Sequence, residues 1–228
     1  MLSEVSHSRI GWDQHHRIIP SRFPPVGVFE DTADPEDLGA VFEVEALTNE
    51  RLRDAAGEIN LVAPEDRVSG PNSTVVMAAF THIGKASRFN DEFFGAYYAG
   101  SSTRVAIAET RFHKAVFMRD TNQPPQALEM REYVGRPTDV PFVDIREASP
   151  ADVLNPDPER YGAAQEFARA HRENAENGIV YPSVRLEGGE CLAAFRPTAI
   201  GLPQQAAHFQ YYWDGLSISK VWQLTEIN

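Results

Sequence analysis

The distribution of extended and helical segments constrains the fold of this chain more than any other sequence feature. Four short apolar or aromatic runs that are candidates for strands lie in its last quarter, at residues 179–184, 191–195, 209–213 and 218–224. Gly188-Gly189 separates the first two runs and predicts a hairpin turn. Because no helical pattern interrupts these runs, they cannot alternate with helices as a doubly wound parallel sheet requires. We therefore predict a mixed α+β fold with partly segregated strands and helices.

Two amphipathic helices are expected ahead of these strands. Residues 103–117 carry Val105, Ala108, Phe112 and Ala115 at steps of three and four, which is the spacing of one helix face. A second helix is predicted over 159–176, and Asn177-Gly178 is a typical helix stop. Shorter segments are predicted as helices at 34–48 and 74–81, as strands at 95–99, 127–134 and 140–145, and as a loop at 64–73. Residues 1–33 show no regular pattern.

Charge and composition exclude several classes of protein. The formal net charge of −12 argues against nucleic-acid binding, which needs a basic surface, although a local arginine pocket can still hold a small anion. The apolar runs are too short to span a bilayer, and the N-terminus lacks the pattern of a signal peptide. A single cysteine, Cys191, allows no internal disulfide. We expect a cytoplasmic protein with no membrane partner.

Common catalytic and metal-binding motifs are absent from the sequence. It contains no G-x-G-x-x-G after a strand, no Walker A loop, no H-E-x-x-H and no G-x-S-x-G elbow. The adjacent His15 and His16 point in different directions in any extended segment, so they do not indicate a metal site. We predict no metal.

Four residues in a fixed order carry a more specific signal. Arg88 lies in an R-F-N run, Tyr98 follows ten residues later, Glu109 comes eleven residues after that on the predicted helix, and Ser183 lies in a Y-P-S-V-R run. Together these motifs resemble the RES domain, a toxin family named for an Arg, a Glu and a Ser. The resemblance covers about residues 76–215.

The resemblance also suggests how the chain is divided. Residues 76–228 are expected to form the RES domain, and residues 1–75 an N-terminal extension that is partly helical and packs on the core. The segments 21–25 and 47–49 are similar to the extension of a longer RES subfamily.

The resemblance to this family implies a fold and an activity. RES proteins look like ADP-ribosyltransferases, with a strand-rich core and flanking helices. They deplete NAD by cleaving the nicotinamide–ribose bond, and either water or inorganic phosphate is the acceptor. Many are paired with an Xre-type antitoxin that neutralises them, and we expect a homodimer. The resemblance thus implies an NAD glycohydrolase or NAD phosphorylase.

Each matched residue suits a role in this chemistry. The carboxylate of Glu109 can stabilise the positive charge that develops on the ribose. Arg88 can bind the pyrophosphate or an acceptor phosphate, and Arg185 is a second candidate for a phosphate contact. Tyr98 can stack on the cationic nicotinamide. Ser183 can bind the ribose or orient Glu109.

Other interpretations remain open at this point. Taken singly, Glu109 is an ordinary solvated charge, Arg88 a structural cation and Tyr98 a core residue; only the joint match indicates a site. His113 lies four residues from Glu109 and is interpreted as a packing residue. The fold also suits transfer of ADP-ribose to a macromolecule, or a non-catalytic module that binds a partner.

Overall fold

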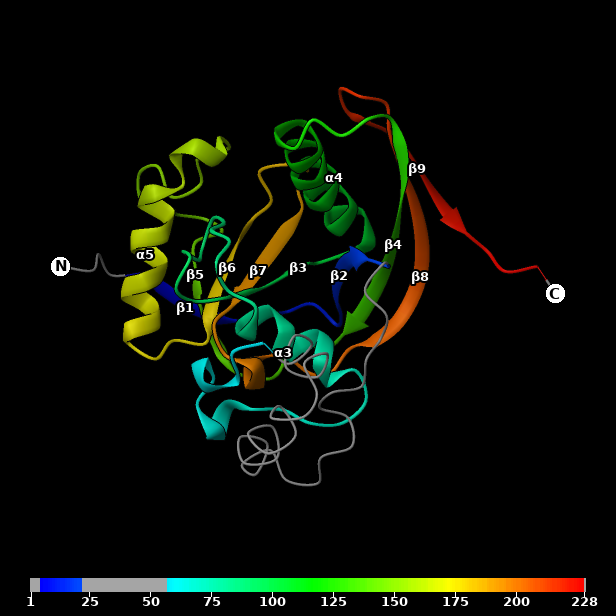
Figure 1. Cartoon of the computed structure of the whole chain (residues 1–228). Helices are drawn as coiled ribbons and strands as arrows, with labels where there is room; N and C mark the ends of the chain where they lie inside the picture. Colours follow the sequence, from blue (N-terminus) through cyan, green and yellow to red (C-terminus); the bar gives the residue numbers. More distant parts are fainter. Residues whose placement is uncertain (1–4, 22–56, 228) are drawn as a thin grey trace.

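A single nine-stranded mixed sheet organises the part of the chain that the computed structural model describes, residues 5–21 and 57–227 (Figure 1). Its strands are β1 (Ser6–Arg9), β2 (His15–Pro20), β3 (Tyr97–Gly100), β4 (Gln126–Gly135), β5 (Pro141–Asp144), β6 (Gly178–Pro182), β7 (Glu190–Ala194), β8 (Gln204–Trp213) and β9 (Ile218–Leu224). Their order in the sheet is β1-β5-β6-β7-β3-β2-β4-β8-β9. Neighbouring strands are antiparallel except β5 and β6, which are parallel.

Three α-helices accompany the sheet within the described residues. They are α3 (Ser73–Thr81), α4 (Thr103–Asp120) and α5 (Gly162–Glu173). The mixed α+β class, with a strand-rich core and flanking helices, is confirmed. Among the shorter elements, α5 begins later than predicted because a separate 3-10 turn, Pro158–Arg160, precedes it. The helix predicted over 34–48, the segment 47–49 and most of 21–25 lie outside the described residues.

Two strands lie within residues 5–21, although this part of the sequence shows no regular pattern. Residues 6–9 and 15–20 form β1 and β2, and β2 lies inside the sheet between β3 and β4. The strand β2 escapes prediction because its buried residues include His15, which removes the usual apolar alternation. The division of the chain at residue 75 stays a prediction, but β2 belongs to the same sheet as the later strands.

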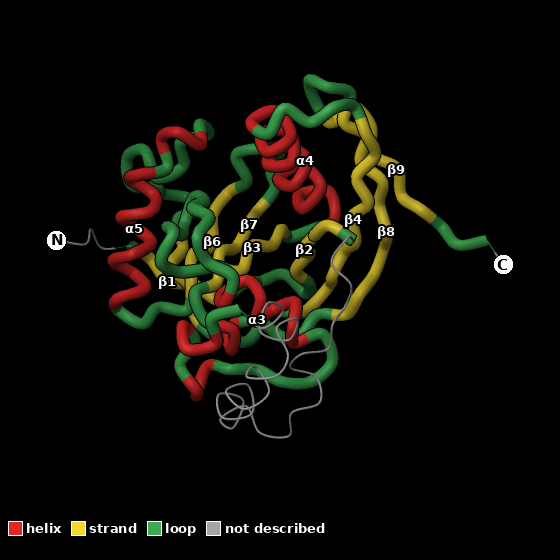
Figure 2. Tube along the Cα trace, viewed as in Figure 1, coloured by secondary structure: helices red, strands yellow, loops and turns green. Residues whose placement is uncertain are grey.

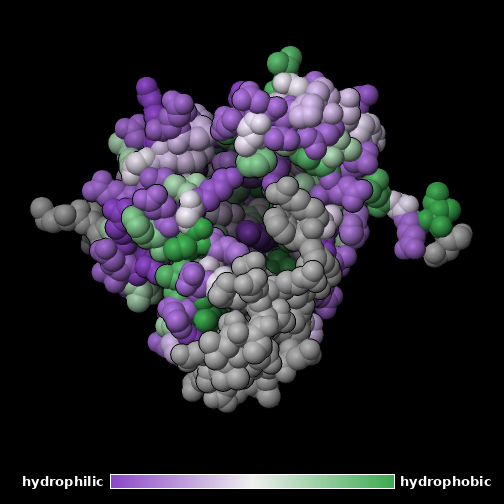
Figure 3. All heavy atoms as spheres, in the orientation of Figure 1, coloured by the Kyte–Doolittle hydropathy of each residue, from purple (hydrophilic) through white to green (hydrophobic). Residues whose placement is uncertain are grey.

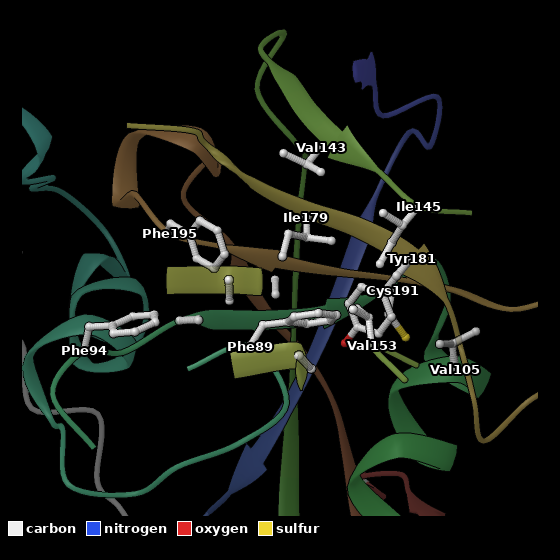
Figure 4. Packing of buried hydrophobic residues seen from close by; sticks show 14 residues of the cluster. Phe89, Phe94, Val105, Val143, Ile145, Val153, Ile179, Tyr181, Cys191 and Phe195 are labelled. Carbon is white, nitrogen blue, oxygen red and sulfur yellow. The ribbon is translucent and has the colours of Figure 1, made fainter. Parts of the chain in front are cut away.

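Different helices cover the two faces of the sheet (Figures 1 and 2). On one face, α3 packs against the alternate residues of β3, β6 and β7 that include Tyr97 and Val180. On the other face, α5 and the first turn of α4 cover the intervening residues, among them Ile179 and Tyr181, together with Phe89 (Figure 4). The rest of α4 packs on β4, β8 and β9. Because successive strand residues point to opposite faces, Tyr98 and Cys191 lie on the α4 and α5 side.

The start of α4 is fixed tightly against β3. The Ser102 side chain caps the helix by accepting a hydrogen bond from the Val105 amide at 3.3 Å. At Gly100, a Cβ atom would lie 2.8 Å from a methyl group of Val105, so only glycine allows the helix to approach this closely. This contact sets where the second turn of α4, which carries Glu109, meets the sheet.

No helix among the described residues is long and apolar enough to cross a membrane.

Candidate active site

A pocket lies between α4 and the ends of strands β2, β3, β6 and β7. Three of the four residues expected at the site, Arg88, Tyr98 and Glu109, line it, and so do His16 and Arg17 of β2. Figure 3 shows a hollow next to α4, with strongly hydrophilic atoms at its floor. The pocket therefore gathers residues from segments that are far apart in the sequence.

Glu109 is held in place by Ser183. The Ser183 hydroxyl donates a hydrogen bond to Oε1 of Glu109 at 2.6 Å. The same oxygen of Ser183 accepts hydrogen bonds from the backbone amides of Arg185 and Leu186, each at 3.1 Å. Because both lone pairs of the hydroxyl are engaged, its proton is directed at the Glu109 carboxylate. Ser183 thus orients Glu109 from outside the pocket lining.

The buried thiol of Cys191 contacts the Glu109 carboxylate. Sγ of Cys191 is 3.6 Å from Oε1 of Glu109, and Tyr181 lines the pocket beside it. Burial, and then the Glu109 charge, raise the pKa of the Cys191 thiol well above its usual value. The thiol is therefore neutral at physiological pH and acts as a weak donor to Glu109.

Arg88 is a buried cation with neutral partners. Its side chain donates to the carbonyl oxygens of Asn155 at 2.6 Å and Val153 at 3.3 Å, and to the Tyr161 hydroxyl at 3.3 Å. Its guanidinium also stacks on the Tyr161 ring, 4.4 Å from the centroid. Among the described residues no carboxylate forms an ion pair with Arg88, although the residue is only 5% exposed. A buried guanidinium without a counter-charge is suited to binding an anion.

The hydroxyl of Tyr98 is engaged in hydrogen bonds within the protein. The hydroxyl donates to Oδ1 of Asn90 at 2.9 Å and accepts from the Phe89 amide at 2.8 Å, and burial raises its pKa. These bonds fasten the segment that carries Arg88 to β3. The ring remains in the pocket lining, where it is available for stacking.

Arg17 was not predicted from the sequence. The strands β2 and β3 pair at His16 and Gly100. The side chain of the next residue on β2, Arg17, donates a hydrogen bond to the Tyr98 carbonyl at 2.9 Å. Its guanidinium lies 4.5 Å from the centroid of the Tyr97 ring, and its Nε has no hydrogen-bond partner among the described residues. No sequence motif pointed to this residue, because the surrounding segment lacked a strand pattern.

Arg185 does not line the pocket. Its guanidinium lies 3.3 Å from the centroid of the Phe112 ring, and it donates to the Pro156 carbonyl and, at 3.4 Å, to the Tyr161 hydroxyl. His113, in contrast, does line the pocket. Desolvation, and then the positive charges of Arg185 and Arg88, lower the pKa of His113.

The two adjacent histidines diverge as expected. The His15 ring meets Tyr97 edge-on at 5.5 Å, on the α3 side, whereas His16 reaches the pocket. Within the described residues no group of three or more histidine, cysteine, aspartate or glutamate side chains could hold a metal ion.

The comparison with protein families agrees with the motif pattern. The model of the RES domain family matches residues 64–214. The uncharacterized protein y4oC of Sinorhizobium fredii is 28% identical over 208 residues, which cover 91% of this chain and 86% of that protein. Among solved structures, the M. tuberculosis MbcT–MbcA toxin–antitoxin complex contains a chain that aligns with a TM-score of 0.37 and 18% identity. That alignment covers 52% of this chain and 69% of the other.

Proposed function

The chain belongs to the RES domain family, and on that premise we propose that it is an enzyme that cleaves the nicotinamide–ribose bond of NAD. In this reaction the carbon–nitrogen bond breaks, and its electron pair leaves with nicotinamide as a neutral molecule. The ribose C1′ becomes electron-poor and is then attacked by an acceptor. No strong general acid is needed for departure of the neutral leaving group.

One observation carries this proposal. The carboxylate of Glu109, fixed by the 2.6 Å hydrogen bond from Ser183, lines the same pocket as the buried cation Arg88. A carboxylate in a fixed position stabilises developing positive charge without having to reorganise during the reaction. A cation on the same pocket suits a substrate that combines a charged ribosyl centre with phosphates.

The remaining pocket residues support a dinucleotide substrate. Arg88 provides a guanidinium group in the pocket lining of a chain whose net charge is −12, so this local charge opposes the overall charge. Guanidinium groups bind phosphates with two parallel hydrogen bonds. The ring of Tyr98, whose hydroxyl is engaged elsewhere, offers a flat surface for the nicotinamide ring.

Product analysis tests this proposal. The purified chain is incubated with NAD labelled in the adenylate part, with and without phosphate, and the products are separated. We expect free nicotinamide together with ADP-ribose or its 1-phosphate. Label attached to a macromolecule in the presence of cell extract would indicate transfer instead. NAD that stays intact in the presence of folded protein would refute the proposal.

A role as a toxin neutralised by an antitoxin is part of the same proposal. Family membership supports an Xre-type antitoxin partner and a homodimeric enzyme. Light scattering after size exclusion tests the dimer, and a monomer mass would contradict it. Growth arrest on expression, relieved by replacing Glu109, tests the toxic activity.

A further inference from the structure

A second carboxylate lies beside the pocket, paired with a histidine. Nδ1 of His16 is 2.9 Å from Oε1 of Glu132. The Glu132 side chain is 5% exposed and the His16 side chain 14% exposed. His16 lines the pocket, whereas Glu132 lies on β4 and is not one of the lining residues. This pair takes no part in the chemistry assigned so far.

Glu132 is held as an ionised acceptor. Thr103, the first residue of α4, donates to its Oε1 at 2.7 Å. Although burial raises the pKa of Glu132, hydrogen bonds from His16 and Thr103 outweigh this and lower it below the usual value. The backbone amide of Ala207 also hydrogen-bonds to this carboxylate.

A bulge in β8 explains the contact with Ala207. Arg131 of β4 faces His208, but Tyr133 faces Gln205, so β8 contains one extra residue opposite Glu132. An extra residue leaves a backbone group unpaired in the ladder, and bulges often lie next to active sites. Here the freed amide of Ala207 donates to the Glu132 carboxylate. The geometry of the sheet therefore fixes the position of this carboxylate.

The pairing also fixes the tautomer of His16. An ionised carboxylate only accepts hydrogen bonds, so Nδ1 of His16 carries the proton that is donated to Glu132. When the ring is neutral, Nε2 holds a lone pair, and no hydrogen bond to Nε2 is found among the described residues. This is the arrangement by which a buried carboxylate prepares a histidine to act as a base.

His16 and Glu109 reach the same pocket from different elements. His16 lies on β2 and Glu109 on α4, and both line the pocket. Thr103, the first residue of α4, is 3.3 Å from Nδ1 of His16, so the helix that carries Glu109 also contacts the histidine. Glycosidases that activate a water place a carboxyl group and a second catalytic group on opposite sides of the reacting sugar. A histidine and a carboxylate that line one pocket suit the same arrangement.

Building on the proposed NAD cleavage, we propose that His16 is the general base that activates water as the acceptor, and that Glu132 positions it. As the bond to nicotinamide breaks, the water oxygen forms a bond to C1′ and its proton passes to Nε2 of His16. The products are ADP-ribose, nicotinamide and an imidazolium, which later releases the proton to solvent. Inorganic phosphate, already an anion, needs no such base, so the pair favours hydrolysis over phosphorolysis.

Competition between water and azide tests this assignment. Azide is an anionic nucleophile that needs no proton removal, so its attack does not depend on His16. Wild type and His16→Gln are incubated with NAD and azide, with sodium chloride at equal ionic strength as the control, and ADP-ribose and ADP-ribosyl azide are quantified. We expect the ratio of azide adduct to ADP-ribose to rise at least about tenfold in His16→Gln, because a general base contributes about 10²–10⁴-fold. His208→Gln, an exposed histidine on β8, should leave the ratio unchanged.

The outcomes separate the two levels of the proposal. If His16→Gln releases both products more slowly in an unchanged ratio, His16 is structural and the inference is wrong while NAD cleavage stands. Wild-type release of ADP-ribose 1-phosphate alone would also overturn it, because water would not be the acceptor. If the wild type releases no nicotinamide, the proposed function fails and the inference falls with it. Should His16→Gln not fold, Glu132→Gln is measured in its place, with the same rise in the ratio expected.

Discussion

The hydroxyl of Ser183 donates to Oε1 of Glu109 at 2.6 Å while it accepts from the amides of Arg185 and Leu186. These two residues are 74 positions apart in the sequence, on the β6–β7 connection and on α4. A hydroxyl held by two amides can direct its proton in one direction only. The relationship makes Ser183 a positioning residue for the carboxylate on which the proposed chemistry depends.

Ser183→Ala should lower kcat about 10–100-fold with a smaller change in KM. Loss of a hydrogen bond to a charged group costs about 1.5–3 kcal/mol, and here it is lost where positive charge develops. Initial rates of nicotinamide release across NAD concentrations provide the measurement. Ser149→Ala, which alters an exposed hydroxyl that donates to the Pro150 carbonyl, serves as the matched control. Equal kcat in both variants would contradict the role of Ser183.

Arg88→Met should raise KM for NAD strongly, by about tenfold or more, because a charge-assisted contact to phosphate is lost. Its three hydrogen bonds to neutral partners predict some loss of stability as well, so thermal unfolding is followed in parallel. Arg160→Met, an exposed arginine, is the control. Unchanged KM in a folded Arg88→Met variant would exclude Arg88 from the phosphate site.

Tyr98→Phe should affect stability more than binding. The hydroxyl makes two hydrogen bonds that join the Arg88 segment to β3, and an unsatisfied partner costs about 1–3 kcal/mol. The ring is retained, so we expect KM to change little. Urea unfolding gives the stability difference relative to Tyr212→Phe, whose side chain is 37% exposed. A large rise in KM without loss of stability would show instead that the hydroxyl contacts the substrate.

His15 should make the fold sensitive to acid. Burial lowers the pKa of His15 from 6.5 to about 4, so the folded state keeps the ring neutral while the unfolded state takes up a proton. Its contribution to stability is therefore present above about pH 6.5 and is lost as pH falls to about 4. The full loss is about 3.5 kcal/mol at about 1.4 kcal/mol per pH unit.

Unfolding free energies at pH 7 and pH 5 test this expectation. The decrease between the two values should be smaller in His15→Leu than in wild type, whereas the exposed His208→Gln should match wild type. An identical decrease in His15→Leu and wild type would show that other groups govern the acid sensitivity.

Much of the fold was predictable because its later strands and helices carry strong local signals. The strand β9 and the helix α4 follow their hydrophobic patterns within a few residues, whereas β8 begins five residues before the predicted run at 209–213. The strand β2 was not predictable, because its buried His15 and its pocket-facing residues break the alternation of apolar side chains. For the same reason the sequence did not identify His16 and Arg17 as pocket residues.

The candidate site was only partly predictable. Arg88, Tyr98 and Glu109 reach one pocket as the motif spacing suggested, but the spacing could not show which atoms are already engaged. The hydroxyl of Tyr98 is taken up by Asn90 and Phe89. Arg185 follows Ser183 by two residues, yet its side chain packs on Phe112 outside the pocket lining. Such contacts depend on tertiary packing, which local patterns do not encode.

Nicotinamide release by wild type and by Glu109→Gln, measured side by side with thermal unfolding, tests the central claim most directly. The substitution keeps the shape of the side chain and removes its negative charge. We predict steady release by wild type and at least about 10²-fold slower release by a variant of similar stability, because the stabilising charge is absent. Equal rates from the two folded proteins would contradict the assignment of Glu109 and, with it, the account of the site.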